Sequence, residues 1–268
     1  MAGTRIGVVG SGGRMGRMLV AEIVASQGCT LAGGCARPGS GYVNQDIGEL
    51  AAIGRLGIAV SDSAEKVIRD SDVAIDFTVP AATAAHTAVA ADLGKAMVVG
   101  TTGLSADQVE AVRQAAREIP IVWAPNMSLG INLLLGLVKE VARRLGPEWD
   151  VEIMEMHHHG KVDAPSGTAL ALGRAVAEGR GAVFEEVQQR ARDGITGPRR
   201  SGDIGFASLR GGDAVGDHYV IFSGAGERLE LTHHATSRVI YAKGAVQAAR
   251  WVVGRPPGLY GLKEVLGL

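Results

Sequence analysis

A glycine-rich turn between a strand pattern and a helix pattern is the feature that most constrains the fold of this chain. Residues 4–9 form the β-type run TRIGVV, which breaks at Gly10 and continues into a segment with apolar residues at helical spacing. Strand and helix patterns then alternate with short connections as far as residue 125. This alternation predicts a parallel sheet with helices packed on both faces.

Local signals place the other elements of this first half. We expect further strands at residues 29–36, 56–60, 73–78, 96–100 and 119–125. Pro80 predicts the first turn of a helix that ends near Gly94, and Ser105 with Gln108 predicts a capping box for a helix through residue 117. Serine and aspartate at residues 61–63 are suited to cap another helix.

The pattern changes after Pro125. Residues 131–146 show the spacing of an amphipathic helix, and residues 150–157 alternate with period two. After a helix pattern at 168–179, residues 204–210, 217–223 and 228–234 are expected as antiparallel strands separated by glycine turns. The final helical pattern, 237–254, fits either half by its spacing alone. We expect a second domain of the α+β class with a mostly antiparallel sheet.

Composition limits the classes of partner. The 268 residues include 27 Lys and Arg against 28 Asp and Glu, a formal charge of −1, which gives no broad basic surface for nucleic acid or an anionic membrane. No apolar run approaches the ~18 residues of a membrane span, and the first residues lack a signal-peptide pattern. We therefore expect a cytoplasmic protein. Cys29 and Cys35, the only cysteines, predict buried thiols rather than a disulfide or zinc framework.

The glycines of the first turn are spaced for a phosphate-binding loop. Gly10, Gly13 and Gly16 follow a strand and open a helix, so the backbone can approach a pyrophosphate at the positive end of the helix dipole. This context predicts a Rossmann-like dinucleotide-binding domain of the α/β class. Met15 stands where the common G-x-G-x-x-G motif has its last glycine, which shifts the register by one residue. We expect contacts to the cofactor from Gly10, Gly13, Arg14, Met15 and Gly16.

The end of the second strand bears on the choice of cofactor. An acidic residue there would bind the ribose 2′-hydroxyl of NAD, whereas arginine suits the 2′-phosphate of NADP. The sequence reads CARPGSG, with Arg37 and no acid. This favours NADPH, with NADH as the alternative, unless Arg37 is only a solvated loop cation.

The segment MEMHHHGKVDAPSGTAL, residues 154–170, raises three interpretations: a metal site, a proton-handling site or an exposed polar loop. Adjacent histidines on a strand point to opposite faces, which disfavours metal. Lys161 and a helix start at Ser166 instead predict a carboxylate site, with His157 and His158 beside it as groups that titrate near neutral pH. The prediction is a small acidic substrate held next to a proton donor.

Seven segments in order, GSGGRMG, DFT, GTTG, APNMSLGIN, HHHGKVDAPSGTAL, IGFASLRGGDAVGDH and GERLELTHHATSR, resemble the dihydrodipicolinate reductase family over nearly the whole chain. The resemblance implies reduction of 4-hydroxy-tetrahydrodipicolinate to tetrahydrodipicolinate by NAD(P)H in lysine and diaminopimelate biosynthesis. It also implies a homotetramer built by the open sheet of the second domain. We assign residues 1–126 and 238–268 to the dinucleotide-binding domain and residues 127–237 to the substrate-binding and tetramerisation domain.

The resemblance also implies roles for individual residues. His157 corresponds to the general acid of the family and Lys161 to its partner. Segments that resemble those bordering the nicotinamide contribute Phe77, Thr78, Gly100, Thr101, Thr102, Gly103, Ala124, Pro125, Asn126 and Met127. The substrate carboxylates would be held by His158, Lys161, Gly167, Thr168 and Arg238.

The sequence departs from the family pattern in two places. Ala36 stands where many relatives have an acid before Arg37, and His159 with Gly160 replaces other basic residues, so His159 is given no role. Two rival functions are compatible with a dinucleotide-binding fold. The first is another NAD(P)-dependent oxidoreductase of two domains, such as a semialdehyde or sugar dehydrogenase. Those that act on aldehydes by acyl transfer would need a cysteine nucleophile in the second domain, which this sequence lacks. A non-catalytic NADP-binding sensor is the other, and the pair of His157 and Lys161 counts against it.

Overall fold

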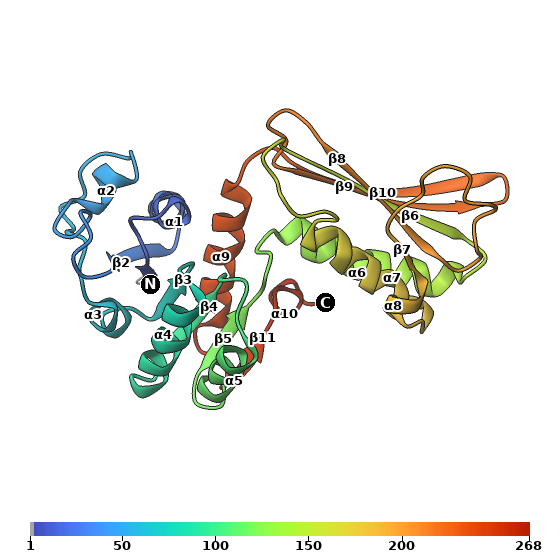
Figure 1. Cartoon of the computed structure of the whole chain (residues 1–268). Coiled ribbons are helices and arrows are strands. Elements are labelled where there is room, and N and C mark those ends of the chain that lie inside the picture. Colours follow the sequence, from blue (N-terminus) through green and yellow to red (C-terminus); the bar gives the residue numbers. More distant parts are fainter. Residues whose placement is uncertain (1–2) are drawn as a thin grey trace. The chain divides into compact units, whose positions relative to one another are not determined.

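The computed structural model describes residues 3–268 and divides into two compact units (Figure 1). The first contains the chain up to Leu129 together with Val239–Gly267, and the second contains Gly130–Arg238 with Leu268. Within residues 3–268, no helix is both long enough and apolar enough to cross a membrane.

The first unit contains a six-stranded, wholly parallel sheet in the order β11-β5-β4-β3-β1-β2. Its strands are β1 (Thr4–Val9), β2 (Cys29–Cys35), β3 (Val73–Asp76), β4 (Ala96–Val99), β5 (Pro120–Trp123) and β11 (Gly258–Tyr260). The strand predicted at residues 56–60 is wrong, because the carboxylate of Asp46 accepts the backbone N–H groups of Leu56 and Gly57. Only an isolated bridge forms there, between Asp46 and Ala59. The short strand β11 was not predicted.

Helices cover both faces of this sheet, as the alternating pattern predicts. They are α1 (Arg14–Ala25), α2 (Ile47–Leu50), α3 (Ala64–Arg69), α4 (Pro80–Asp92), α5 (Ala106–Ala115), α9 (Val239–Val252) and α10 (Leu262–Leu266). One core packs α1 and α9 against Ile75 and its neighbours, whereas the other packs α3, α4 and α5 against Ala74 and Met97. The capping box of Ser105 and Gln108 is present, which confirms that prediction.

The second unit contains a five-stranded mixed sheet in the order β10-β9-β6-β8-β7. Its strands are β6 (Asp150–His157), β7 (Gln188–Gln189), β8 (Ile204–Arg210), β9 (Gly216–Gly224) and β10 (Glu227–Ala235). Strand β9 pairs antiparallel with β6 and β10, whereas β8 pairs parallel with β6 and β7. The antiparallel prediction for residues 204–210 is therefore wrong. The connection through α7 is long enough to return the chain to the end of the sheet where β6 began.

The alternating residues of β6 explain how this sheet is buried on one face. Val151 and Ile153 are fully buried against the helices, while the alternate residues Glu152 and Met154 are partly exposed. The helices of this unit are α6 (Leu129–Leu145), α7 (Gly167–Arg180) and α8 (Phe184–Val187). This half-buried pattern is typical of a sheet with one face on the core.

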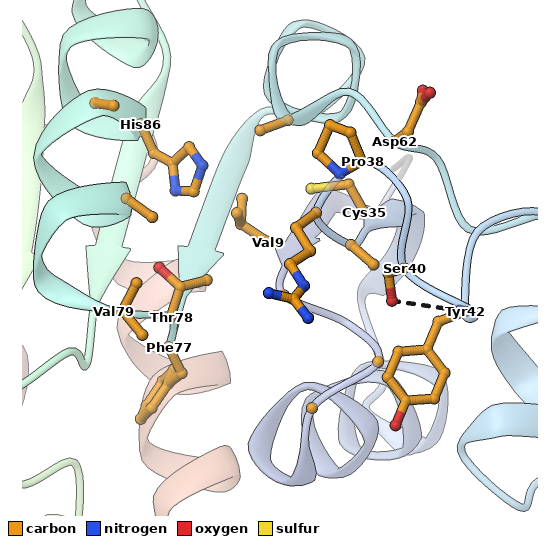
Figure 2. A pocket seen from close by; sticks show the side chains of 18 residues that line it. Val9, Cys35, Pro38, Ser40, Tyr42, Asp62, Phe77, Thr78, Val79 and His86 are labelled. Carbon is orange, nitrogen blue, oxygen red and sulfur yellow. Dashed lines mark hydrogen bonds between the residues drawn. The ribbon is translucent and has the colours of Figure 1, made fainter.

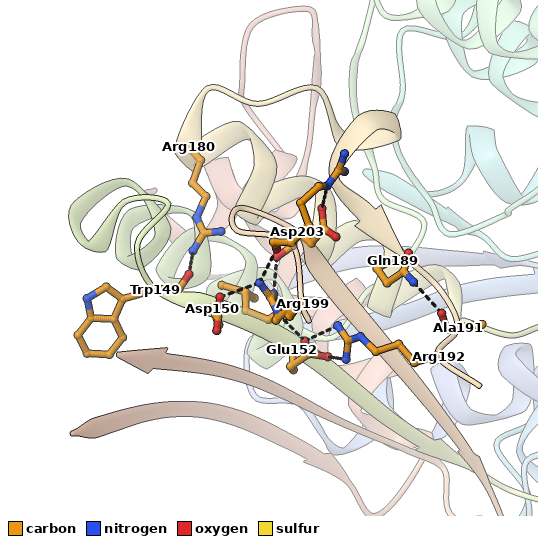
Figure 3. Close-up of polar contacts among 11 residues, drawn as sticks. Trp149, Asp150, Glu152, Arg180, Gln189, Ala191, Arg192, Arg199 and Asp203 are labelled. Atoms are coloured by element: carbon orange, nitrogen blue, oxygen red, sulfur yellow. Dashed lines mark hydrogen bonds and ion pairs between the residues drawn. The ribbon is translucent and has the colours of Figure 1, made fainter. Parts of the chain in front are cut away.

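Arg199 ties the long segment between β7 and β8 to the sheet (Figure 3). Its guanidinium donates to the carboxylates of Asp150 (2.7 Å) and Glu152 (3.1 Å) and to the carbonyl oxygen of Val151 (3.0 Å). Arg192 forms two further hydrogen bonds with Glu152. These ion pairs hold a loop that has little apolar surface of its own.

Candidate active site

The parallel register brings the carboxyl ends of five strands into one row in the first unit. Val9, the last residue of β1, pairs with Cys35 at the end of β2 and with Asp76 at the end of β3. Asp76 pairs in turn with Val99, and Val99 with Trp123. The residues that follow these strands therefore share one edge, and they include most of the positions predicted to contact a cofactor.

A cavity of about 650 Å³ lies at this edge, where the strand order reverses between β1 and β3. Open α/β sheets bind ligands at such a switch point. Figure 2 shows Thr78 and Phe77 on one side of the cavity and Pro38 and Tyr42 on the other. Five predicted positions line it, namely Gly10, Gly13, Arg37, Phe77 and Thr78.

The other predicted cofactor positions lie around the same edge without lining this cavity. Arg14 and Met15 begin α1, and Gly16 is buried in its first turn. A Cβ atom on Gly16 would be 2.2 Å from the carbonyl oxygen of Gly10, so only glycine lets the helix pack against the turn. The remaining positions follow β4 and β5: Gly100, Thr101, Thr102, Gly103, Ala124, Pro125, Asn126 and Met127.

The glycine turn has the geometry that a pyrophosphate needs. Gly10 has a φ of +79°, which disfavours a residue with a side chain. The N-cap residue of α1 is Gly13, so no side-chain oxygen caps the start of this helix. The backbone N–H groups of the first helical turn therefore face the glycine turn without a competing side-chain acceptor. The residues present thus fit a dinucleotide at the positive end of this helix dipole.

The end of β2 presents Arg37 to the cavity. Arg37 is exposed and follows Ala36, so no carboxylate occupies the position that would bind a ribose 2′-hydroxyl. Asp62 also lines the cavity, on a separate loop, although its sequence context predicts only a helix cap. Burial raises the pKa of the neighbouring Cys35 thiol to about 11, so this cysteine is an inert packing group.

A buried carboxylate that sequence reasoning missed organises the end of β3. Asp76 accepts hydrogen bonds from the backbone N–H and hydroxyl of Thr78 (2.8 and 2.6 Å), and it lies 2.8 Å from Nδ1 of His86. Thr101 joins through its hydroxyl, which accepts from the backbone N–H of Thr78 and the hydroxyl of Thr83. The signal in the sequence that could have identified this carboxylate is an aspartate at the end of an otherwise apolar strand. This network fixes the loops on which Thr78 and Thr101 lie.

In the second unit, His157 ends β6 on its buried face. Its Nδ1 atom lies 2.5 Å from a carboxylate oxygen of Glu155, and its ring meets the ring of His218 edge-on at 5.2 Å between centroids. Burial lowers the pKa of His157, while the hydrogen bond and charge of Glu155 oppose that shift. His157 is thus a mostly buried imidazole held by one nitrogen.

The three adjacent histidines have different hydrogen-bond partners. The backbone N–H of His158 donates to the carbonyl oxygen of Ala214 (2.8 Å), and Nδ1 of the exposed His159 lies 3.1 Å from the carbonyl oxygen of Gly212. Among residues 3–268, no group of three or more His, Cys, Asp and Glu side chains is arranged to hold a metal ion. His159 thus tethers one loop to another.

Lys161 and the start of α7 lie in the loop that follows. The ammonium of Lys161 pairs with Asp163 (2.7 Å), and the Lys161 side chain is 19% exposed, so a substrate carboxylate would compete with that aspartate. Ser166 caps α7 by accepting the backbone N–H of Ala169 at 3.1 Å, which confirms the predicted cap. Gly167 is exposed and Thr168 partly exposed in the first turn, and Arg238 is exposed after β10.

Comparison with known proteins decides the family. Two protein-family models match the chain. The family model for the N-terminus of dihydrodipicolinate reductase matches residues 4–127, and the family model for its C-terminus matches residues 130–266. The chain belongs to the dihydrodipicolinate reductase family. This confirms the family prediction, and the chain is accordingly an NAD(P)H-dependent oxidoreductase of lysine and diaminopimelate biosynthesis.

Individual relatives of the chain agree with this family assignment. Proteins named 4-hydroxy-tetrahydrodipicolinate reductase from Afipia carboxidovorans and Alkalilimnicola ehrlichii are 52% and 51% identical to it. The matches cover 100% and 99% of this chain and 98% and 99% of the relatives. A solved dihydrodipicolinate reductase from Paenisporosarcina sp. TG-14, described as dipicolinate-bound, has the same fold. Its TM-score is 0.78 at 24% identity, over 98% of this chain and 99% of that one.

Proposed function

We propose that the chain reduces 4-hydroxy-tetrahydrodipicolinate to tetrahydrodipicolinate with NADPH as its preferred reductant and NADH as the alternative. The observation that carries the proposal is the site in the second unit, where a buried imidazole, a lysine and a capped helix start lie within ten residues of sequence. A dicarboxylate ring needs such cations and N–H donors, and its reduction needs a proton.

The first unit would hold the dinucleotide. The turn from Gly10 to Gly16 with Arg14 and Met15 would bind the pyrophosphate, and Arg37 would bind the 2′-phosphate. Phe77, Thr78, residues 100–103 and residues 124–127 would border the nicotinamide. When bound, this cofactor supplies a hydride.

The second unit would hold the substrate and supply the proton. Reduction adds one hydride to C4 of the unsaturated ring and one proton after the electrons move toward the ring nitrogen, and the hydroxylated substrate also loses water. His157 would give the proton, and Lys161 would stabilise the developing charge. His158, Gly167, Thr168 and Arg238 would bind the two carboxylates beside Lys161.

The test compares His157→Gln with His159→Gln. Substrate is made freshly from pyruvate and aspartate semialdehyde, and oxidation of NADPH is followed by absorbance. Loss of a general acid costs ~10² to 10⁴ in rate, so His157→Gln should reduce kcat at least 100-fold while NADPH still binds. His159→Gln should retain kcat. Near-normal turnover of His157→Gln would reject its role, and no oxidation by the unaltered protein would favour a non-catalytic sensor.

We also propose that the protein acts in the cytoplasm as a homotetramer. Support comes from the outer face of the sheet of the second unit, where Leu209 (45% exposed) lies opposite the partly exposed Met156 and Met154 lies opposite the partly exposed Tyr219. Contiguous apolar side chains on a sheet face are typical of an interface. Light scattering of the purified protein should give the mass of four chains, and a monomer mass at micromolar concentration would reject the proposal.

A further inference from the structure

Glu155 is a buried carboxylate with hydrogen-bond partners on β6, on β8 and at the residue that precedes α7. It is fully buried on β6, two residues before His157 on the same face. One oxygen accepts from Arg210 (2.9 Å) and from the backbone N–H of Ser166 (3.2 Å). The other accepts from Arg210 (2.9 Å) and contacts Nδ1 of His157 (2.5 Å). Every one of these partners is a donor or can be one.

The strand register explains why these groups meet. His157 lies opposite Arg210 in the parallel pairing of β6 with β8, and Glu155 lies opposite His218 in the antiparallel pairing of β6 with β9. The side chain of Ser166 contacts Nε2 of His218 at 3.1 Å and caps α7. One carboxylate therefore connects the imidazole to the first residues of the helix.

The charge balance keeps Glu155 ionised. Burial opposes ionisation, but hydrogen bonds from Arg210, His157 and Ser208 outweigh it and lower the pKa of Glu155. An ionised carboxylate is an acceptor only, so Nδ1 of His157 must carry a hydrogen. The nitrogen that remains to exchange a proton is Nε2.

We propose that Glu155 is a positioning residue: it fixes the Nδ1–H form of His157, leaves Nε2 to deliver the proton, and through Ser166 holds the start of α7 in register with that imidazole. The proposal rests on the proposed function, in which His157 is the acid and the first turn of α7 binds a substrate carboxylate. Its structural part concerns the ring of His157 alone and can be measured without turnover.

The other charged groups around His157 act in the opposite direction to Glu155. Lys161 and Arg210 both disfavour its protonation, and His218 is a buried neighbour that is also hard to protonate. Removing the charge of Glu155 should therefore shift the titration of His157 to more acidic pH. The same change should move the alkaline limb of the pH–kcat profile to lower pH, because that limb follows loss of the acid's proton.

The test is Glu155→Gln, read by ¹⁵N NMR of the histidine rings, with His157→Gln used to assign the His157 signals. The amide has one acceptor and one NH₂ donor, whereas every contact of Glu155 brings a donor. If the amide oxygen faces Arg210 and Ser166, the NH₂ group faces Nδ1, and the neutral ring must become the Nε2–H form. We expect the unaltered protein to show mainly Nδ1–H and the variant mainly Nε2–H.

Kinetics and controls complete the test. We expect Glu155→Gln to lower kcat at pH 7 at least ~10-fold, with the KM for substrate within ~3-fold, and Glu155→Asp to restore part of kcat because it keeps the charge.

Glu155→Gln with Arg210→Gln leaves no unpaired buried charge, so this double variant tests the tautomer even if the single variant fails to fold. An unchanged tautomer and pH profile in folded variants would overturn the proposal. If His157→Gln is fully active while Glu155→Gln still changes the tautomer, the proposed acid fails but the positioning contact stands.

Discussion

Gly216 lies beside the Nε2 atom of His157: a Cβ atom on this glycine would be 2.9 Å from that nitrogen. Gly216 begins β9, and its backbone does not have a positive φ, so the reason for glycine is space and not conformation. Contacts below 3.0 Å to a Cβ atom force a shift of the neighbour. Because Glu155 holds Nδ1 at 2.5 Å, the ring of His157 has little freedom to move away.

Gly216→Ala should therefore impair the imidazole without removing it. We expect kcat to fall ~10-fold or more, since displacing the proposed general acid would forfeit much of a contribution of ~10² to 10⁴. Gly211→Ala is a matched control, because its Cβ would meet only the flexible end of Met156 at 3.3 Å. Equal kcat for the two variants, both folded by circular dichroism, would contradict the prediction.

Arg37→Ala should change the preference between the two reduced cofactors. A hydrogen bond to a charged group contributes ~1.5–3 kcal/mol, so loss of a 2′-phosphate contact should raise the KM for NADPH about 10-fold to 100-fold. The KM for NADH should stay within ~3-fold, because NADH has no phosphate there. Steady-state kinetics with both cofactors measures this, with Arg14→Ala for comparison. An equal rise in KM for both cofactors would mean that Arg37 does not bind the 2′-phosphate of NADPH.

Acid should destabilise the protein through His218. Burial lowers the pKa of His218 from its ordinary 6.5 to about 4, with His157 as a further cause. The unfolded chain therefore binds the proton more readily, so the stability is fully present above pH 6.5 and is lost as pH falls toward 4. The difference corresponds to ~3 kcal/mol of unfolding free energy.

Urea unfolding at pH 7.5, 5.5 and 4.5 checks this. His218→Gln should be less stable at pH 7.5, because Ser166 loses its partner, but it should show a smaller decrease toward pH 4.5. His234→Gln, at a half-exposed position, should keep the decrease of the unaltered protein. The prediction is wrong if the pH dependence of His218→Gln matches that of the control.

Arg199→Met should release the segment between β7 and β8 (Figure 3). The variant loses hydrogen bonds to Asp150, Val151 and Glu152 in a side chain that is only 20% exposed, so we expect a loss of about 2 kcal/mol in unfolding free energy. Limited proteolysis should cut residues 190–203 faster. Arg228→Met, which removes an exposed pair with Glu230, should change neither. Unchanged cleavage of Arg199→Met would show that other contacts hold the loop.

Local chemistry made much of the fold predictable. The glycine turn, the cap at Ser166 and the box at Ser105 depend on residues within a few positions of each other, and all three are present. The failed strand at 56–60 shows the limit of such reasoning. Its apolar pattern is correct, but Asp46, ten residues earlier, takes the backbone donors that a strand would need.

The candidate site was only partly predictable for the same reason. His157 and Lys161 are marked by their sequence context, whereas Glu155 looks like any alternating residue of β6 until the register brings Arg210 and His218 beside it. That register depends on β8 running parallel to β6, which the sequence pattern did not predict. Asp76 is similar, because its partners Thr101 and His86 come from different segments.

Helix α9 and strand β11 belong to the first unit although they follow the second in sequence. Ala242, Ala245 and Ala249 of α9 are fully buried against the sheet that begins at Thr4. A nascent chain emerging from the ribosome therefore cannot close its first hydrophobic core until more than a hundred further residues have been synthesised. Until then the face of the sheet that α9 covers is exposed, and a chaperone can bind it. The nucleotide-binding half therefore reaches its native structure late in synthesis.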